Sequence, residues 1–170
     1  MRLFIATEFK SEEFSRLRRE FNIKGIKVAD HFHLTWKFLG DVDEKQLPEI
    51  IKKLKKIKAS KFKVTSTNLG SFPSRWDVQV IWVGLDGKEI TGLKNEIEET
   101  LLEIFPKDKR FSVHITLGRV KFINDKKMIQ EKLKQEISKE EFEISDFKLI
   151  KSELKPEGPE YTTLEEFNLG

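Results

Sequence analysis

Two short motifs carry the side chains best suited to chemistry. His33-Leu34-Thr35 recurs 81 positions later as His114-Ile115-Thr116, in a chain with only three histidines. Both tripeptides lie in apolar, strand-like runs, where residues two apart share a face. We therefore expect each histidine to stand beside its threonine, with Leu34 or Ile115 pointing into the core behind them.

Two imidazoles and two hydroxyls on one face suit acid–base chemistry on a phosphate. Hydrolysis of a cyclic phosphate on a ribose needs a base that takes a proton from water and an acid that protonates the departing ribose oxygen, on opposite sides of phosphorus. Histidine serves either role because its ordinary pKa lies near neutrality. Thr35 and Thr116 can donate hydrogen bonds to the non-bridging oxygens. No metal, cofactor or covalent intermediate is needed, and the symmetry of the motifs leaves acid and base unassigned.

Other interpretations of the histidines stay open. In a regular strand His31 shares a face with His33, and together with His114 they could bind a catalytic zinc ion. That arrangement leaves both threonines without a role, and no carboxylate stands out as the usual partner of a zinc-bound histidine. A second alternative is a module that binds RNA ends without turnover. The plainest interpretation is two half-buried strand histidines with no chemical role.

Arg119 is a further candidate for phosphate binding. It follows His114 by five residues and could bind phosphate through two hydrogen bonds. Strict strand alternation would point it away from His114, unless Gly118 marks a bulge or the end of the strand.

Several aromatic and basic residues are candidates for contacts with a nucleotide. Tyr161 could stack on a base, and Arg75 lies in a proline-containing segment that could touch one. Trp36 and Phe38 could also stack, but both fall on the apolar face of their strand. We therefore assign these two to the core.

The composition indicates a folded, water-exposed domain. Of the 170 residues, 38% are hydrophobic, which is enough for a packed interior. A further 36% are charged. The lack of cysteine excludes disulfides and thiolate metal sites, and a net charge of +3 tolerates an anionic partner. No apolar run approaches a membrane span, and Glu8 follows Met1–Ala6 too early for a signal peptide. We expect a soluble cytoplasmic monomer without a membrane partner.

The order strand, helix, motif strand, helix occurs twice, over roughly residues 2–58 and 78–139. This predicts a duplicated α+β unit, in which residues 1–170 form one bilobal domain and the His-Thr pairs face each other across a central cleft. Strands are expected over Arg2–Phe9, Phe32–Leu39, Phe62–Thr67, Val78–Leu85, Arg110–Val120, Phe142–Ser152 and Tyr161–Leu169, a loop over Gly70–Arg75, and a long helix over Ile90–Ile104.

The chain resembles the two-histidine (2H) phosphoesterases, whose motif is His-x-Thr-x. Within that superfamily it is similar to the RNA 2',3'-cyclic phosphodiesterases, also called 2'-5' RNA ligases. The blocks that carry the resemblance are Met1–Ala6, His33–Gly40 (HLTWKFLG), Val80–Gly84, His114–Lys121 (HITLGRVK) and Gly158–Tyr161, and they extend over nearly the whole chain. The chain departs from the family at Val113, where proline is common, and in the loop at Pro73–Trp76, which we expect to be shortened.

The resemblance implies a fold, an activity and a role for each motif residue. The fold would be bilobal α+β, with two antiparallel sheets around the cleft and helices outside. The activity would open 2',3'-cyclic phosphate RNA ends, with tRNA halves as a candidate substrate, to a 2'-phosphate, and reversible 2'-5' RNA ligation would be a second activity. His33 would be the proton donor to the 3'-oxygen and His114 the proton acceptor from water. Thr35, Thr116 and Arg119 would hold the phosphate.

Overall fold

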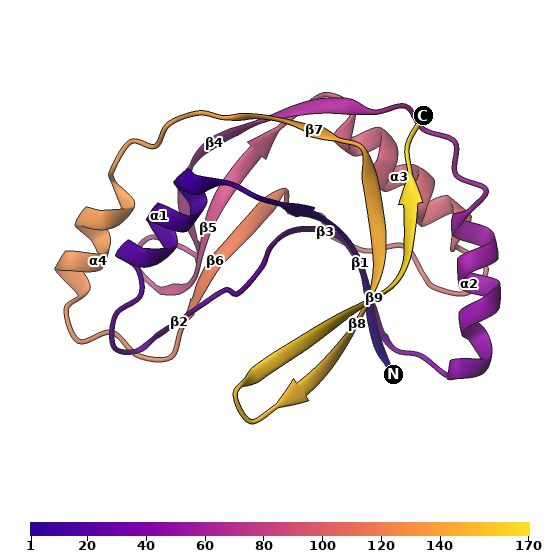
Figure 1. Ribbon diagram of the computed structural model, residues 1–170. Coiled ribbons are helices and arrows are strands. Elements are labelled where there is room, and N and C mark those ends of the chain that lie inside the picture. The colour runs from indigo at the N-terminus through magenta and orange to yellow at the C-terminus, as the bar shows by residue number, and fades with distance from the viewer.

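Nine antiparallel strands form one curled sheet in the computed structural model, which describes residues 1–170 (Figure 1). Eight strands follow the order β7-β4-β5-β6-β3-β1-β8-β9, and β2 pairs with β6. Their bounds are β1 Arg2–Phe9, β2 Ile26–Val28, β3 Phe32–Asp41, β4 Phe62–Pro73, β5 Val78–Asp86, β6 His114–Val120, β7 Glu141–Ile144, β8 Asp146–Lys155 and β9 Gly158–Asn168. The predicted α+β class is confirmed. The prediction of two separate sheets is wrong, because β3 and β6 pair at Leu34 and Ile115 and so join the halves into one sheet.

Four helices lie at the two ends of the curled sheet. Figure 1 shows α1 and α4 together at one end and α2 and α3 together at the other. Ser11 caps α1 by accepting a hydrogen bond from the Phe14 amide, and Asp43 caps a short 3₁₀ turn before α2. The helix bounds are α1 Glu12–Glu20, α2 Leu47–Leu54, α3 Ile90–Thr100 and α4 Lys126–Leu133.

Some element boundaries differ from those expected. The segment Gly70–Pro73 belongs to β4 and not to a loop, because a glycine at position 70 leaves room for the Trp82 ring of β5. The second motif strand begins at His114 instead of Arg110, and α3 ends at Thr100. In place of one strand over Phe142–Ser152 there are two, β7 and β8, because they pair with different neighbours, β4 and β1.

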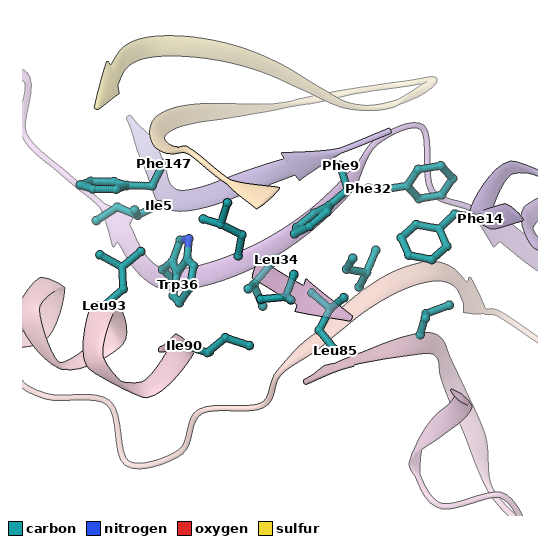
Figure 2. Close-up of a cluster of buried hydrophobic side chains, with 14 of the residues drawn as sticks. Ile5, Phe9, Phe14, Phe32, Leu34, Trp36, Leu85, Ile90, Leu93 and Phe147 are labelled. Carbon is teal, nitrogen blue, oxygen red and sulfur yellow. The ribbon is translucent and has the colours of Figure 1, made fainter. Parts of the chain in front are cut away.

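One hydrophobic core supports both motif strands. A single cluster of 33 buried residues runs through the molecule, and both Leu34 and Ile115 are fully buried within it. Figure 2 shows Leu34 among the side chains of Trp36, Leu85 and Ile90. The residues between each histidine and threonine are therefore anchored in the core, as the alternation predicts. No helix has the length and apolar character required to span a membrane.

Candidate active site

The two motif strands meet at one backbone pair. Leu34 of β3 lies opposite Ile115 of β6 in an antiparallel register. That register sets His33 toward Thr116, and Thr35 toward His114. Because the side chains of Leu34 and Ile115 point into the core, the two histidines and two threonines lie on the opposite face of the sheet. The structure therefore relates the two motifs by an approximate two-fold axis through the Leu34–Ile115 pair.

Each motif strand contains a bulge just after its threonine. Between β1 and β3 the register skips Trp36, and between β5 and β6 it skips Leu117. A bulge adds one residue and so reverses the alternation beyond it. Phe38 and Arg119, each five residues after its histidine, are thereby turned to the face that carries the histidines and threonines.

These bulges correct one assignment and decide another. Phe38 is not a core residue: it is 70% exposed, while Trp36 is fully buried. Arg119 lies opposite Val80, whereas Gly118 lies opposite the fully buried Ile81. The structure therefore contains the bulge that places Arg119 on the same face as Thr116.

A cavity of about 430 Å³ opens on this face, between β2, β3, β6 and the β8–β9 hairpin. Its volume lies within the range of small-molecule sites. Its lining includes His33, Thr35, Thr116, Arg119 and Tyr161, together with Phe38. His114 and Arg75 are not part of this lining. A larger depression, of about 1010 Å³, lies beside the start of α1, is lined mostly by charged side chains and contains neither threonine.

His33 sits in an aromatic enclosure beside a carboxylate. The rings of Phe4 and Tyr161 meet it edge-on, with centroids 5.7 and 5.4 Å away, and the His31 ring stacks at 5.6 Å. Its Nε2 lies 3.5 Å from Oε1 of Glu8. Burial lowers the pKa of His33, and Glu8 opposes that change by favouring the charged ring.

His114 sits in a second aromatic enclosure without a carboxylate. The Phe72 ring meets it edge-on at 5.0 Å and the Trp82 ring at 6.4 Å. Its Nδ1 lies 3.1 Å from the carbonyl oxygen of Ser112. A carbonyl only accepts hydrogen bonds, so Nδ1 carries a proton and the neutral ring keeps its lone pair on Nε2. Burial lowers the pKa of His114; the Ser112 carbonyl raises it, and Arg119 lowers it further.

The two residues predicted to contact a nucleotide, Tyr161 and Arg75, lie in different parts of the structure. The Tyr161 ring of β9 lies against His33 and Phe4 in the cavity, and burial raises the pKa of its hydroxyl. Arg75 lies in the turn between β4 and β5, where its guanidinium stacks on the exposed Trp76 ring, 4.6 Å from the centroid. The structure therefore brings Tyr161 to the motif residues and leaves Arg75 outside them.

A buried ionic cluster behind β3 was not predicted. Lys37 and Lys94 both bind Glu98 and Asp108, at distances of 2.6–3.0 Å. Lys94 also donates to the carbonyl of Trp36. The cluster ties β3 and α3 to the segment that leads into β6 and so fixes the backbone beneath both motifs. The i, i+4 spacing of Lys94 and Glu98 was visible in the sequence, but only the fold shows that this pair is buried.

Potential metal ligands do not gather on this face. No group of three or more histidine, cysteine, aspartate or glutamate side chains is arranged so that it could hold a metal ion. His31 and His33 stack on each other, but His114 lies in its separate enclosure against Phe72. The three-histidine zinc site therefore lacks the convergent ligand set that it requires.

Comparison with known proteins identifies the fold and the family. The profile of the family described as LigT like Phosphoesterase matches residues 7–82 and again residues 83–161. A crystal structure of a Thermus thermophilus protein superposes with a TM-score of 0.82 at 26% identity, covering 99% of this chain and 97% of that one. Escherichia coli LigT in its apo form has the same fold, with a TM-score of 0.78 at 21% identity over 99% of this chain and 96% of that one.

Curated relatives match along their whole length. A Methanocaldococcus jannaschii protein named RNA 2',3'-cyclic phosphodiesterase is 36% identical over 98% of this chain and 100% of its own length. An Archaeoglobus fulgidus protein of the same name is 35% identical over 98% of this chain and 99% of its own length. With its two motifs on paired strands and this family match over both halves, the chain belongs to the LigT-like phosphoesterase family.

Proposed function

We propose that the protein is an RNA 2',3'-cyclic phosphodiesterase, which opens cyclic phosphate ends to a 2'-phosphate without a metal ion. The observation that carries the proposal is the Leu34–Ile115 pair, because it sets two histidines and two threonines around one point on one face. Full-length relatives named for this activity support the same substrate class.

The phosphate is held by neutral and cationic donors. The hydroxyls of Thr35 and Thr116 donate hydrogen bonds to the two non-bridging oxygens, from opposite strands. Arg119 adds a positive charge, with the planar geometry that suits phosphate. These donors stabilise the charge that the oxygens carry as the fifth bond to phosphorus forms.

Hydrolysis then proceeds by in-line displacement. Nε2 of His114 accepts a proton from water, and the resulting oxygen attacks phosphorus opposite the 3'-oxygen. The P–O3' bond breaks, and protonated His33 donates its proton to the departing 3'-oxygen. The product carries a 2'-phosphate and a free 3'-hydroxyl. The histidine environments support this assignment, because a carboxylate favours the charged form of His33 and the Ser112 carbonyl leaves Nε2 of His114 unprotonated.

The RNA enters through its terminal nucleotide. Phe38 and Tyr161 provide aromatic faces at the cavity on which the terminal base stacks. When an RNA 5'-hydroxyl replaces water as the nucleophile, the same displacement breaks the P–O3' bond and forms a 2'-5' linkage, which is ligation. RNAs that end in cyclic phosphates, tRNA halves among them, are the substrate class, and the monomer suffices because one chain holds every group named.

The test is hydrolysis of a short RNA ending in a 2',3'-cyclic phosphate in excess EDTA, with 2'- and 3'-phosphate products resolved. We expect a 2'-phosphate from the wild type and no product from a His33→Ala, His114→Ala double variant. Turnover only after zinc is added would favour metal catalysis instead. Tight binding of the RNA end without turnover in either condition would indicate a binding module.

A further inference from the structure

The approximate two-fold symmetry of the site is broken at one position. Each motif strand pairs with a strand that comes earlier in the chain, on the other side of a helix. β1 precedes α1 and pairs with β3, and β5 precedes α3 and pairs with β6. In the first case Glu8 lies directly opposite His33, and in the second Gly84 lies directly opposite His114. Residues directly opposite each other place their side chains on the same face. His33 therefore has a carboxylate beside it where His114 has none.

Neither arrangement is easily changed by local movement. Glu8 is held from its other side by Lys148, whose Nζ lies 3.5 Å from Oε2, while Oε1 faces His33. Lys148 is itself fixed by pairing of β8 with β1, where it lies opposite Ala6. At Gly84 a side chain has no room, because an added Cβ would clash with the hydroxyl of Thr67. The asymmetry is thus built into the backbone pairing.

From this asymmetry we infer that Glu8 is the positioning residue that makes His33, and not His114, the general acid. The inference rests on the proposed function. The carboxylate stabilises the imidazolium that the acid needs at the start of the reaction, and it fixes the plane of the ring toward the cavity. The Nε2 of His33 has no hydrogen-bond partner at normal distance, so the contact with Glu8 is one that can tighten when substrate binds.

None of the other groups that face His33 stabilises the charged form of its ring. Lys148 of β8 and His31, just before β3, disfavour the imidazolium through like charge. Tyr161 of β9 presents its ring edge and is neutral at the pH of the reaction. Glu8 is therefore the only anionic side chain among the groups that contact His33. Lys148 and His33 in turn overcome the burial of Glu8 and lower the pKa of its carboxyl, so that Glu8 is charged throughout the working range.

The test is an NMR titration of the three histidine rings in the full chain. We expect Glu8→Gln to lower the pKa of His33 by about one pH unit, the effect of losing a nearby opposite charge, and to leave the pKa of His114 unchanged. Glu166→Gln is the matched control, because Glu166 lies opposite the same Lys148 on β9 but makes no contact with His33. It should leave both values unchanged. The unaltered signals of His114 report that each variant is folded.

A kinetic measurement separates positioning from a structural role. With the cyclic phosphate RNA, Glu8→Gln should lower kcat about tenfold, the effect of that pKa change on the protonated fraction of the acid. With an analogue in which sulfur replaces the 3'-oxygen, the loss should nearly vanish, because a thiolate departs without a proton. An unchanged pKa of His33 in Glu8→Gln, or an equal loss on both substrates, would overturn the inference. Absence of hydrolysis by the wild type would instead overturn the proposed function, whatever the titration shows.

Discussion

Leu34 on β3 and Ile115 on β6 form the backbone pair through which the two motif strands meet, and both side chains are fully buried. The side chains of this pair pack in the core on one face of the sheet. The histidines and threonines lie around the pair on the opposite face. The geometry of the proposed active site therefore depends on the apolar packing behind it.

Truncation of this pair should cost both stability and rate. We expect Leu34→Ala to reduce the free energy of unfolding by about 2–5 kcal/mol, because it opens a cavity in a packed core. A misplacement of about 1 Å between the motifs would lower kcat by about 10²-fold. Urea unfolding and steady-state kinetics measure the two effects. Leu154→Ala, at an exposed position on the β8–β9 hairpin, is the control and should change neither.

The threonine hydroxyls should matter mainly in the transition state. Thr35→Val and Thr116→Val keep the shape of the side chain and remove the donor. Each is expected to lower kcat by about 10²–10³-fold, as loss of one donor to a developing oxyanion does, with a smaller change in KM. Thr162→Val on β9 provides a control at an exposed strand position. A rise in KM with kcat unchanged would contradict this prediction, because it would show that the hydroxyls bind the ground state and the transition state equally.

The pH dependence should reflect two histidines that protonate less readily than usual. Burial lowers the pKa of both His33 and His114 below their ordinary value of 6.5. Because the acid must hold its proton and the base must have lost one, kcat/KM should follow a bell whose alkaline limb lies below pH 6.5. The two limbs belong to the pair. In the pH profile of kcat, the alkaline limb should lie at higher pH than in the profile of kcat/KM, because the bound phosphate anion stabilises the imidazolium. A kcat/KM that stays constant from about pH 5 to about pH 9 would contradict the two-histidine mechanism.

The buried ionic cluster should make the fold sensitive to loss of one carboxylate. Glu98→Ala leaves Lys37 and Lys94 short of a partner and is expected to cost about 3–5 kcal/mol. Glu103→Ala, which removes an exposed partner of Lys53, should cost far less, because surface ion pairs contribute little to stability. Thermal or urea unfolding compares the two, and equal losses would show that the cluster is not a structural unit.

Acid should weaken the same cluster. Burial alone would raise the pKa of Asp108, but hydrogen bonds from Lys94 and Lys37 outweigh it and hold that pKa below the ordinary value. The stabilisation is therefore complete above a pH of about 4 and is lost as pH falls through the lower folded value. Urea unfolding at a series of acidic pH values measures this loss, which should be smaller in Asp108→Asn.

The placement of the motif side chains could be predicted from the sequence because it depends on local spacing. A His-x-Thr strand places both side chains on one face wherever the strand lies, so His33, Thr35, His114 and Thr116 needed no knowledge of their neighbours. Whether the two halves arose by duplication over residues 2–58 and 78–139 stays a prediction.

Features set by strand pairing could not be predicted in this way. Phe38 was assigned to the core because alternation was extended past a bulge that only the β1–β3 register reveals. The side of the strand on which Arg119 lies depended on the matching bulge in β6. Glu8 gave no local signal, since its importance comes from the residue opposite it on β3. Pairing across strands, and not composition, decided these positions.

The most direct test of the account is to compare His33→Ala and His114→Ala on RNA cyclic phosphates with oxygen or sulfur at the 3' position, in EDTA. With oxygen, each variant should lose about 10²–10⁴-fold in rate. With sulfur, the His33→Ala rate should recover toward that of the wild type, because the leaving group needs no acid, while His114→Ala stays slow. Recovery of His114→Ala instead, or of neither variant, would contradict the assignment of His33 as acid and His114 as base.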